Sequence, residues 1–419
     1  MTHRERIKAA LNHRQPDRVP VDFASTMTSG ISASAVSTLR KALGLDDSDA
    51  RVKVTEPYQM LGEVSDDLKE KMFIDVYGLF NIDNMFGFPN KDWKPWTMFN
   101  GTKVLIPGKF NTEPDERGWI PMYAGGDKNY PPSAYMPKDG FYFDSTSRQR
   151  PIDDAHLNPE DNLVEFGPYS DELCEYLERE SKRVYEETDY AIMYSMGGSG
   201  LGDIALVPAP WSKERGGIRD VEEWYISTVA RRDYVYEVFE RQTEIAIENF
   251  QRVYDAVQNR IEAVFFTGTD FGTQNGPFIS PDAYRDLFKP FHKKMTDWVH
   301  QNTSWKTFMH SCGSIRAFLD DFIEAGVDII NPVQVSAAHM DARELKTEYG
   351  DKLVFWGGGV DTQMTLPFGK PEEVYEQVSE RIRIFNQNGG YVFNTIHNIQ
   401  QGTPVENLTA MLKAIEDSF

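Results

Sequence analysis

The amino-acid sequence predicts a (β/α)8 barrel. From about residue 170 onward, short apolar runs alternate with amphipathic helical stretches, which is the pattern of βαβ units around a parallel sheet. Roughly eight such strands in one series favour a closed barrel over an open doubly wound sheet. No Gly-x-Gly-x-x-Gly motif opens a helix after the first strand, and this disfavours a dinucleotide-binding fold.

The expected elements follow one another along the chain. Near the N-terminus we expect helices over 2–15, 34–45 and 60–72, and a strand over 18–23. Later helices are expected over 170–188, 220–259 (which a break could divide), 281–301, 314–325, 341–349, 371–388 and 404–418. Strands are expected over 190–194, 262–266, 305–309, 327–330, 353–356 and 391–393. This order returns the chain to the sheet after each helix, as a barrel requires.

Residues 80–165 differ from the rest of the chain. Proline, glycine and aromatic residues crowd together there, and helical periodicity disappears. The segments 103–106 and 118–122 flank a polar turn centred on Asp115, Glu116 and Arg117, which predicts a β-hairpin. Long irregular segments in compact domains are usually functional. We therefore interpret 80–165 as an insertion in a single barrel, either packing its own small core or forming a lid for a flat, apolar ligand.

The charge balance narrows the classes of partner. The chain has 44 basic and 65 acidic residues, a net charge of −21, whereas nucleic acids and anionic membranes bind basic surfaces. No apolar run approaches the ~20 residues of a membrane span, and the N-terminus lacks the apolar core of a signal peptide. Two cysteines, Cys174 and Cys312, make no disulfide framework. We therefore expect a cytoplasmic protein without nucleic-acid or membrane partners, with Cys174 in the core.

Polar and metal-capable residues follow the apolar strands directly. Active sites of (β/α)8 barrels lie at the carboxyl ends of the strands, so these residues should gather round one mouth although they are far apart in sequence. They are Thr269 and Asp270, His310 and Cys312, Asn331 and Gln334, Asp361, and His397 with Asn398. Asp361 could equally cap the next helix, and the glycine-rich run 197–200 could form an anion-binding nest or a flexible loop.

His310 and Cys312 are the strongest candidates for metal ligands. Their spacing at a strand end projects both side chains to the same side, and imidazole nitrogen and thiolate sulfur are good zinc ligands. His397, at another strand end, is the natural third ligand of a catalytic zinc. The alternative is a small buried residue at 312 and hydrogen-bonded histidines at the other two positions. Asp270 could coordinate the metal, act as a base or orient the substrate, and we favour the last role.

Several sequence blocks resemble the uroporphyrinogen decarboxylase superfamily. They are residues 4–13 (RERIKAALNH) with 16–20 (PDRVP), 274–281 (QNGPFISP) with Tyr284 and Pro290, and 402–407 (GTPVEN). The resemblance covers nearly the whole chain except the aromatic segment 80–165. It implies a (β/α)8 barrel.

One branch of the superfamily matches better than the others. True uroporphyrinogen decarboxylases use no metal and carry an arginine-containing motif after the first strand, where this chain reads DFAST over 22–26. His310-Ser-Cys312-Gly resembles instead the zinc motif of corrinoid-dependent methyltransferases, such as the methylcobamide:coenzyme M methyltransferases. The later cysteine of those enzymes stands in a Cys-Gly-Ile context, and the matching place here is His397-Asn398-Ile399. Histidine therefore stands where the family has its second cysteine, which leaves the third ligand open.

The resemblance implies methyl transfer to or from the cobalt of a corrinoid carried on a separate protein. Neutral imidazole in place of thiolate leaves a zinc site more positive, which favours polarising an oxygen leaving group. We therefore expect an O-demethylating methyltransferase for a methoxylated, aromatic donor, with Asp270 and Asn331 or Gln334 orienting the donor. The chain could also act as a homodimer. Three alternatives stay open: a methylcorrinoid-to-thiol methyltransferase, a metal-free decarboxylase, and a non-catalytic barrel used for docking.

Overall fold

A parallel sheet of seven strands forms the centre of the computed structural model, which describes residues 1–46, 49–164, 166–195 and 200–419. The strands lie in the order β14-β13-β12-β11-β10-β9-β3, and every neighbouring pair is parallel. Apart from the first strand, the predicted strands thus lie side by side in sequence order. The seven are β3 (Val76–Leu79), β9 (Ala191–Ser195), β10 (Ala263–Thr267), β11 (Lys306–His310), β12 (Ile329–Asn331), β13 (Val354–Trp356) and β14 (Tyr391–Val392).

The segment around Val21 takes the eighth place and closes the sheet into a barrel. Val21 forms a parallel bridge with Phe393. The N–H of Phe393 donates to the carbonyl of Pro20 at 2.8 Å, and the N–H of Asp22 donates to Phe393 at 2.9 Å. On the other side, the carbonyl of Val21 accepts the N–H of Asp75, directly before β3, at 2.8 Å. The predicted (β/α)8 barrel is confirmed. Of the strand predicted over 18–23, only Val21 forms a β-bridge.

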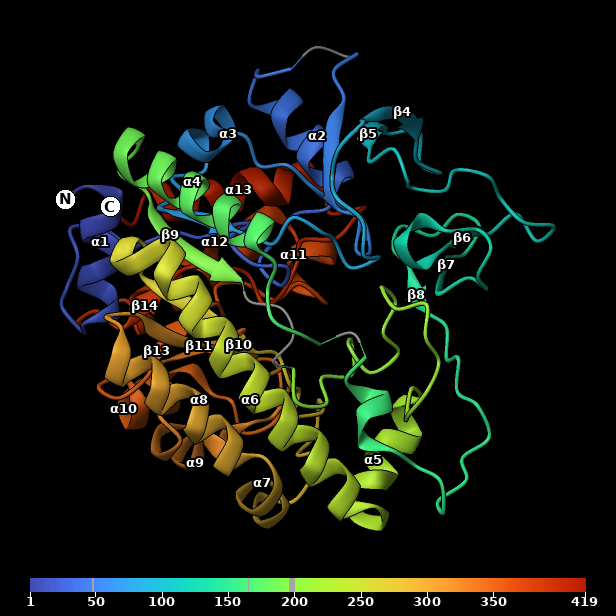
Figure 1. The fold of residues 1–419 in the computed structure, drawn as a ribbon. Coiled ribbons are helices and arrows are strands. Elements are labelled where there is room, and N and C mark those ends of the chain that lie inside the picture. The colour runs from blue at the N-terminus through green and yellow to red at the C-terminus, as the bar shows by residue number, and fades with distance from the viewer. Residues whose placement is uncertain (47–48, 165, 196–199) are drawn as a thin grey trace.

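Helices cover the outside of the barrel (Figure 1). Two stretches predicted as long helices are each divided: 220–259 breaks at Arg231 and 281–301 at Phe288. No helix among the described residues is long and apolar enough to cross a membrane. The outer helices are α2 (Ala33–Ala42), α3 (Asp66–Lys71), α4 (Asp171–Glu187), α5 (Val221–Ala230), α6 (Arg232–Val257), α7 (Pro281–Leu287), α8 (Lys289–Asn302), α9 (Leu319–Glu324), α10 (Ala342–Tyr349), α11 (Thr365–Phe368), α12 (Pro371–Phe385) and α13 (Val405–Glu416).

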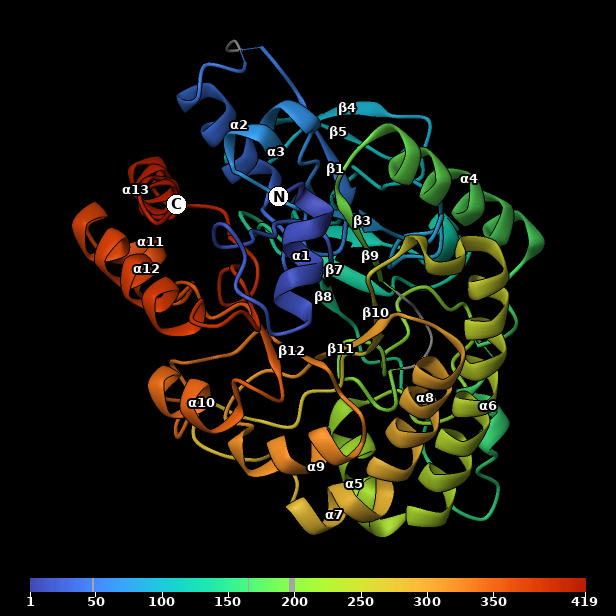
Figure 2. The ribbon, with the colours of Figure 1, turned by 90° about the vertical axis from the view of Figure 1, so that its left-hand side faces the viewer.

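The first helix, α1 (His3–Leu11), closes the amino end of the barrel, where Figure 2 shows it in front of the strands and ringed by the outer helices. Its residues Ile7, Ala10 and Leu11 pack in one cluster with inward-facing side chains of the strands, among them Phe308 and Trp356. Removing such apolar surface from water stabilises the fold by ~25 cal/mol per Å². The floor of the barrel is therefore a packed core, and a site inside the barrel is reached from the carboxyl ends of the strands.

The segment predicted as an insertion carries small sheets on the side of the barrel to which β9 points (Figure 1). One sheet has the order β2-β1-β5-β4 and the other β6-β7-β8. The first sheet joins the segment to residues that precede it in sequence. The strands are β1 (Val52–Glu56), β2 (Leu61–Gly62), β4 (Lys94–Thr97), β5 (Lys103–Ile106), β6 (Ile120–Met122), β7 (Ala134–Met136) and β8 (Asp144–Ser145).

The hairpin predicted between 103–106 and 118–122 is wrong in its pairing. β5 pairs antiparallel with β4, and β6 pairs antiparallel with β7. A tight turn with Gly101 at φ +86° joins β4 to β5. β4 is closer to β5 in sequence than β6 is, and it therefore pairs with β5. The polar turn closes only on itself, through the N–H of Asp115 and the carbonyl of Trp119 at 2.8 Å.

The N-terminal part of the chain departs most from the prediction. The helix predicted over 60–72 is the short α3, preceded by β2. The strands β1 and β3 are unexpected. β3 has only 4 residues, and its Tyr77 and Gly78 are half-buried, so no continuous apolar run marks it in the sequence.

Candidate metal centre at the barrel mouth

His310 and Asn331 end two neighbouring strands at the barrel mouth. β11 and β12 run parallel, with His310 paired to Asn331 in register. Because side chains alternate along a strand, His310 faces the same side as Phe308, which lies in the barrel interior. Both polar residues are buried, with 5% of His310 and 0% of Asn331 exposed. They stand where the apolar floor of the barrel ends.

Asn331 fixes which nitrogen of His310 is free to bind a ligand. Its Oδ1 accepts a hydrogen bond from His310 Nδ1 at 2.6 Å, and its own Nδ2 donates to the carbonyl of Trp356 at 2.8 Å. The amide is thereby held with its oxygen towards the imidazole, so the proton of the neutral ring sits on Nδ1 and Nε2 keeps its lone pair. Burial lowers the pKa of His310 to about 4, so the ring is neutral at physiological pH.

The loop after β11 places Cys312 beside that lone pair, with Sγ 3.2 Å from His310 Nε2. The N–H of Cys312 donates to Asp270 Oδ1 at 2.7 Å, and the N–H of Gly313 donates to Gln334 Oε1 at 2.8 Å. Gly313 has φ +83°, and a Cβ there would lie 2.4 Å from the backbone of the facing loop. Only glycine fits this close approach, which explains the glycine after the cysteine.

Among the described residues, no lysine or arginine affects the pKa of the Cys312 thiol. Burial raises the pKa of this thiol well above its ordinary value, and the carboxyls of Asp270 and Asp203 raise it further. A thiol in such surroundings keeps its proton unless a cation arrives to stabilise the thiolate. A divalent metal between Cys312 and His310 would supply that charge.

His397 completes the cluster, but the hydrogen bonding of its ring differs from that of the His310 ring. Its ring centroid lies 5.5 Å from that of His310, and its backbone adopts the left-handed region at φ +67°, which non-glycine residues seldom occupy. The N–H of Asn398 donates to His397 Nδ1 at 2.8 Å, so the proton of the neutral ring sits on Nε2. Burial lowers the pKa of His397 to about 4. Binding a metal through Nε2 requires that proton to move to Nδ1 and the Asn398 contact to be given up.

The donor set fits zinc. Bonds of ~2.3 Å to sulfur and ~2.1 Å to nitrogen in a tetrahedral arrangement put the two ligand atoms ~3.5 Å apart, and Cys312 Sγ lies 3.2 Å from His310 Nε2. Ligand atoms of His310, Cys312 and His397 all lie within 4.8 Å of one another. Among the residues that the structure describes, these three form the one His, Cys, Asp or Glu cluster with this spacing. Three such ligands would leave a fourth position open, as in catalytic zinc sites.

The three residues predicted to orient a substrate lie around this cluster. Asp270 Oδ1 is 3.9 Å from His310 Nε2, and burial raises the pKa of Asp270. The side-chain oxygens of Asn331 and Gln334 accept hydrogen bonds from His310 and from the N–H of Gly313. Both amides are thus engaged by protein groups, and their contacts position the loop of Cys312 and the ring of His310.

Sequence reasoning missed two residues beside the cluster, Asp203 and Tyr225. Asp203 lies in the loop after β9, and a Cβ on Gly268 would be 2.7 Å from Asp203 Oδ2. Burial raises the pKa of Asp203 to about 8, with the charge of Asp270 as the second cause. The hydroxyl of Tyr225, on α5, is buried and has no hydrogen-bond partner among the described residues, and its pKa is raised by burial and by the carboxyls of Asp270 and Asp203. Applying the strand-end rule further into the loop after β9 would have found Asp203.

The remaining predicted positions have structural roles or lie outside the description. Asp361 Oδ1 accepts the N–H of Gln363 at 2.8 Å and so orders the turn before α11. Cys174 packs against the core from α4. Residues 197–199 of the glycine-rich run lie outside the described residues, and the carbonyl of Gly200 accepts a hydrogen bond from Thr269 Oγ1 at 2.5 Å.

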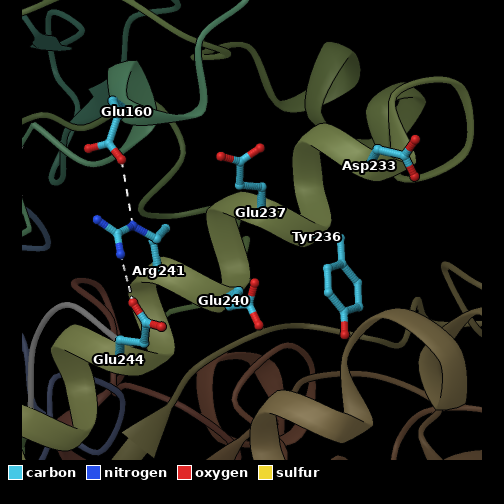
Figure 3. A pocket seen from close by; sticks show the side chains of 7 residues that line it. All are labelled: Glu160, Asp233, Tyr236, Glu237, Glu240, Arg241 and Glu244. Carbon is cyan, nitrogen blue, oxygen red and sulfur yellow. Dashed lines mark hydrogen bonds and ion pairs between the residues drawn. The ribbon is translucent and has the colours of Figure 1, made fainter.

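A hollow on the surface of α6 is separate from the cluster (Figure 3). Acidic side chains line it, and Arg241 reaches Glu244 at 2.9 Å and Glu160 at 3.6 Å. Its lining contains none of the strand-end residues of the candidate site.

The fold and the cluster together define a (β/α)8 barrel with a His–Cys–His group at the carboxyl ends of its strands. The chain belongs to the Uroporphyrinogen decarboxylase (URO-D) family, whose sequence profile matches residues 204–418, about half of the chain. The matched region contains all six predicted site residues. The family resemblance carried by the sequence blocks is thereby confirmed.

Two matches from Methanosarcina mazei show what this chain is similar to. One is a methylated-thiol–coenzyme M methyltransferase, 25% identical over 140 residues, which are 33% of this chain and 34% of the relative. The match thus spans about a third of that relative's length. The other is a solved structure described as a methyltransferase, which aligns with a TM-score of 0.57 and 17% identity over 100% of this chain and 99% of its own. The second likeness supports the barrel fold over the full length.

Proposed function

We propose that this chain is a zinc-dependent methyltransferase that moves a methyl group between a small substrate and the cobalt of a corrinoid. The favoured substrate is a methoxylated aromatic donor, and the corrinoid is a second substrate carried by a partner protein. The observation that carries the proposal is the cluster of His310, Cys312 and His397 at the strand ends. Membership of the URO-D family and the similarity to a methylated-thiol methyltransferase support it.

Each residue of the cluster would supply one ligand to the metal. His310 offers Nε2 because Asn331 holds the proton on Nδ1, and Cys312 offers a thiolate once its proton leaves. His397 is the third proposed ligand. Bound zinc would supply a Lewis acid that draws electron density from the ether oxygen of the donor. In the proposed transfer the C–O bond would break with its electron pair left on oxygen, and cobalt(I) of the corrinoid substrate would provide the pair for the new bond to the methyl carbon.

Asp270 is placed to orient the donor. Its Oδ1 accepts the N–H of Cys312 at 2.7 Å and lies 3.9 Å from His310 Nε2. Fixed dipoles and charges aimed at the reacting atoms lower the barrier because they need no reorganisation during the reaction. We expect Asp270 to contact the substrate directly, whereas Asn331 and Gln334 act through the groups they hold.

The histidine at 397 favours an oxygen leaving group over a thiol. A zinc bound by one thiolate and two neutral imidazoles keeps a net positive charge, whereas a second thiolate would cancel it. The more positive ion polarises an ether oxygen more strongly. A methylcorrinoid-to-thiol methyltransferase is the second candidate, because the curated relative acts on methylated thiols by its name.

A metal-free decarboxylase of the parent type is less well supported. Such an enzyme would need arginines facing the pocket. Among the described residues, no arginine or lysine contributes to the pKa shifts of Asp270, Asp203, Cys312, His310 or His397.

The partner protein must reach the barrel mouth. The loops after β9 and β13 carry α5 and α11, and both expose large apolar side chains: 84% of Val229 and 44% of Ile226 on the first, 78% of Phe368 on the second. Covering apolar side chains exposed to this degree with a partner protein is favourable, and both helices follow strand ends on the rim of the barrel mouth. We propose that the corrinoid protein docks on this rim.

Incubation of zinc-loaded protein with cob(I)alamin and a panel of methoxylated aromatics tests the proposal. We expect methylcobalamin to form, as followed by its absorption spectrum, and to be lost in His310→Ala. His156→Ala removes an exposed histidine whose ring hydrogen-bonds to Asp153 at 2.7 Å, and should react like the wild type. Absence of methylcobalamin with every donor would count against the O-demethylase, and methylation of added thiols by methylcobalamin would reverse the direction.

A further inference from the structure

One aromatic side chain inside the barrel is not fully buried. Among the described residues of the apolar cluster that joins α1 to the inward-facing side chains of the strands, Phe265 of β10 is the one that is only half-buried. The side chains of Ile7, Ala10 and Leu11 close the amino end of the barrel. The open part of the Phe265 ring therefore faces the carboxyl ends of the strands, where the metal cluster lies.

The register of the sheet places Phe265 one layer below the metal cluster. Phe265 is paired with Phe308 of β11 on one side and with Ser195 of β9 on the other. His310 follows Phe308 by two residues, so the two side chains point the same way. Two residues of a parallel strand span about 6.6 Å. Phe265 is thus the part of the barrel floor that is open to the mouth, one layer deeper than His310.

The ring of Phe265 belongs to a stack of three nearly parallel rings. Its centroid lies 5.2 Å from that of Phe308, with planes 28° apart, and 6.3 Å from that of His310, with planes 17° apart. Phe308 is fully buried and His310 is 5% exposed, so the accessible ring surface of this stack is on Phe265. Its neighbours Ser195 and Gly268 are small, and a Cβ on Gly268 would lie 3.3 Å from Phe265 Cζ.

An aromatic ring left open at the base of a pocket favours a particular kind of ligand. Covering its apolar surface is favourable for any apolar group. Aromatic pairs with centroids 4.5–7 Å apart gain a further factor of about two to ten in affinity. The about 6.6 Å between the layer of Phe265 and that of His310 is a distance that one benzene ring with an ether oxygen can span.

We propose that Phe265 is a specificity residue for the methyl donor. Its open ring surface packs against the aromatic ring of a one-ring methoxyarene, whose methoxy group then lies at the level of His310 and Cys312. The inference rests on the proposed function, because it states how the donor is selected and how large its ring system is. Phe265 binds the donor and takes no part in breaking the C–O bond.

Two ligands that carry the same methoxy group and differ in the saturation of the ring test the proposal: anisole and methoxycyclohexane. Their dissociation constants are measured by NMR titration of zinc-loaded protein without corrinoid. The wild type should bind anisole about two- to tenfold more tightly than methoxycyclohexane, which is the gain expected from an aromatic pair. Equal affinities, tighter binding of methoxycyclohexane, or no binding of anisole would overturn the proposal.

Variants assign the preference to Phe265. Phe265→Leu keeps an apolar side chain without a ring, so it should lose the preference for anisole while its affinity for methoxycyclohexane stays within about twofold. Phe99→Leu removes a ring that is 37% exposed in the insertion and should keep the wild-type preference. If Phe265→Leu does not fold, Phe265→Met is the second variant without a ring. A folded Phe265 variant without a ring that still prefers anisole contradicts the assignment.

Binding and turnover report on the two proposals separately. In Phe265→Leu the KM for anisole should rise about two- to tenfold while kcat stays within about twofold, as expected for a contact made equally in the ground state and the transition state. If no donor yields methylcobalamin but the preference for anisole depends on Phe265, the proposed function fails and the binding role stands. If anisole yields methylcobalamin with the same KM in both proteins, the methyltransferase stands and the role of Phe265 fails.

Discussion

Removing the side chain of Asn331 should weaken zinc binding without removing a ligand. Asn331 Oδ1 accepts the Nδ1–H of His310 at 2.6 Å, and its amide donates to Trp356 at 2.8 Å. In Asn331→Ala the imidazole loses this partner, so it can turn or move its proton to Nε2, and then it offers no lone pair to the metal. Loss of such partners behind metal-bound histidines typically costs about 10- to 100-fold in affinity, or about 1.4 to 2.7 kcal/mol.

Competition with a chromophoric zinc chelator measures this change in the dissociation constant. Asn331→Asp keeps the acceptor and adds a negative charge, so it should bind zinc at least as tightly as the wild type. Asn249→Ala removes a similarly buried asparagine, 3% exposed, whose amide donates to the carbonyl of Gly167, and it controls for general destabilisation. A folded Asn331→Ala protein with the zinc affinity of the wild type would refute the role assigned to this hydrogen bond.

Two further predictions concern stability. Asp75→Asn should lower the free energy of unfolding by about 3 to 5 kcal/mol, because the carboxylate of Asp75 is fully buried between Arg6 and Arg18. Asp17→Asn, whose side chain is 39% exposed, should lower it far less. Urea unfolding measures both losses, and equal losses would contradict this prediction. Burial raises the pKa of Glu56 to about 7, above its unfolded value, so its favourable contribution is present below pH ~4.5 and is lost as the pH rises through about 7. Between pH ~4.5 and about 7, the free energy of unfolding of Glu56→Gln should therefore rise by at most about 3 kcal/mol relative to that of the wild type. A difference between the two proteins that stays constant over this pH interval would contradict the pKa shift.

The second half of the fold follows from simple patterns. β10 to β14 are short apolar runs separated by amphipathic helices, and each run is buried on both faces, so hydrophobicity alone marks it. The N-terminal part carries no such mark. β3 has half-buried residues in its centre, and the Val21 segment joins the barrel by one bridge and by Asp75, a long-range contact that local sequence does not encode.

The strand-end rule predicted most residues of the candidate site for a physical reason. His310, Cys312 and Asn331 directly follow or end their strands, so the register of the sheet alone brings them together. Asp203 and Tyr225 were missed because a loop and a helix carry them to the mouth, and their positions depend on tertiary packing. Hydrogen bonds add what spacing cannot: the N–H of Asn398 holds the ring of His397 in the tautomer opposite to that of His310.

The metal content of protein purified without added zinc tests the central claim most directly. We predict about one zinc ion per chain in the wild type, and little in His310→Ala or Cys312→Ser. Cys174→Ser changes the other cysteine, which packs against the core on α4, and should keep the wild-type content. Folded wild-type protein without zinc, or Cys312→Ser protein that holds as much zinc as the wild type, would contradict the claim.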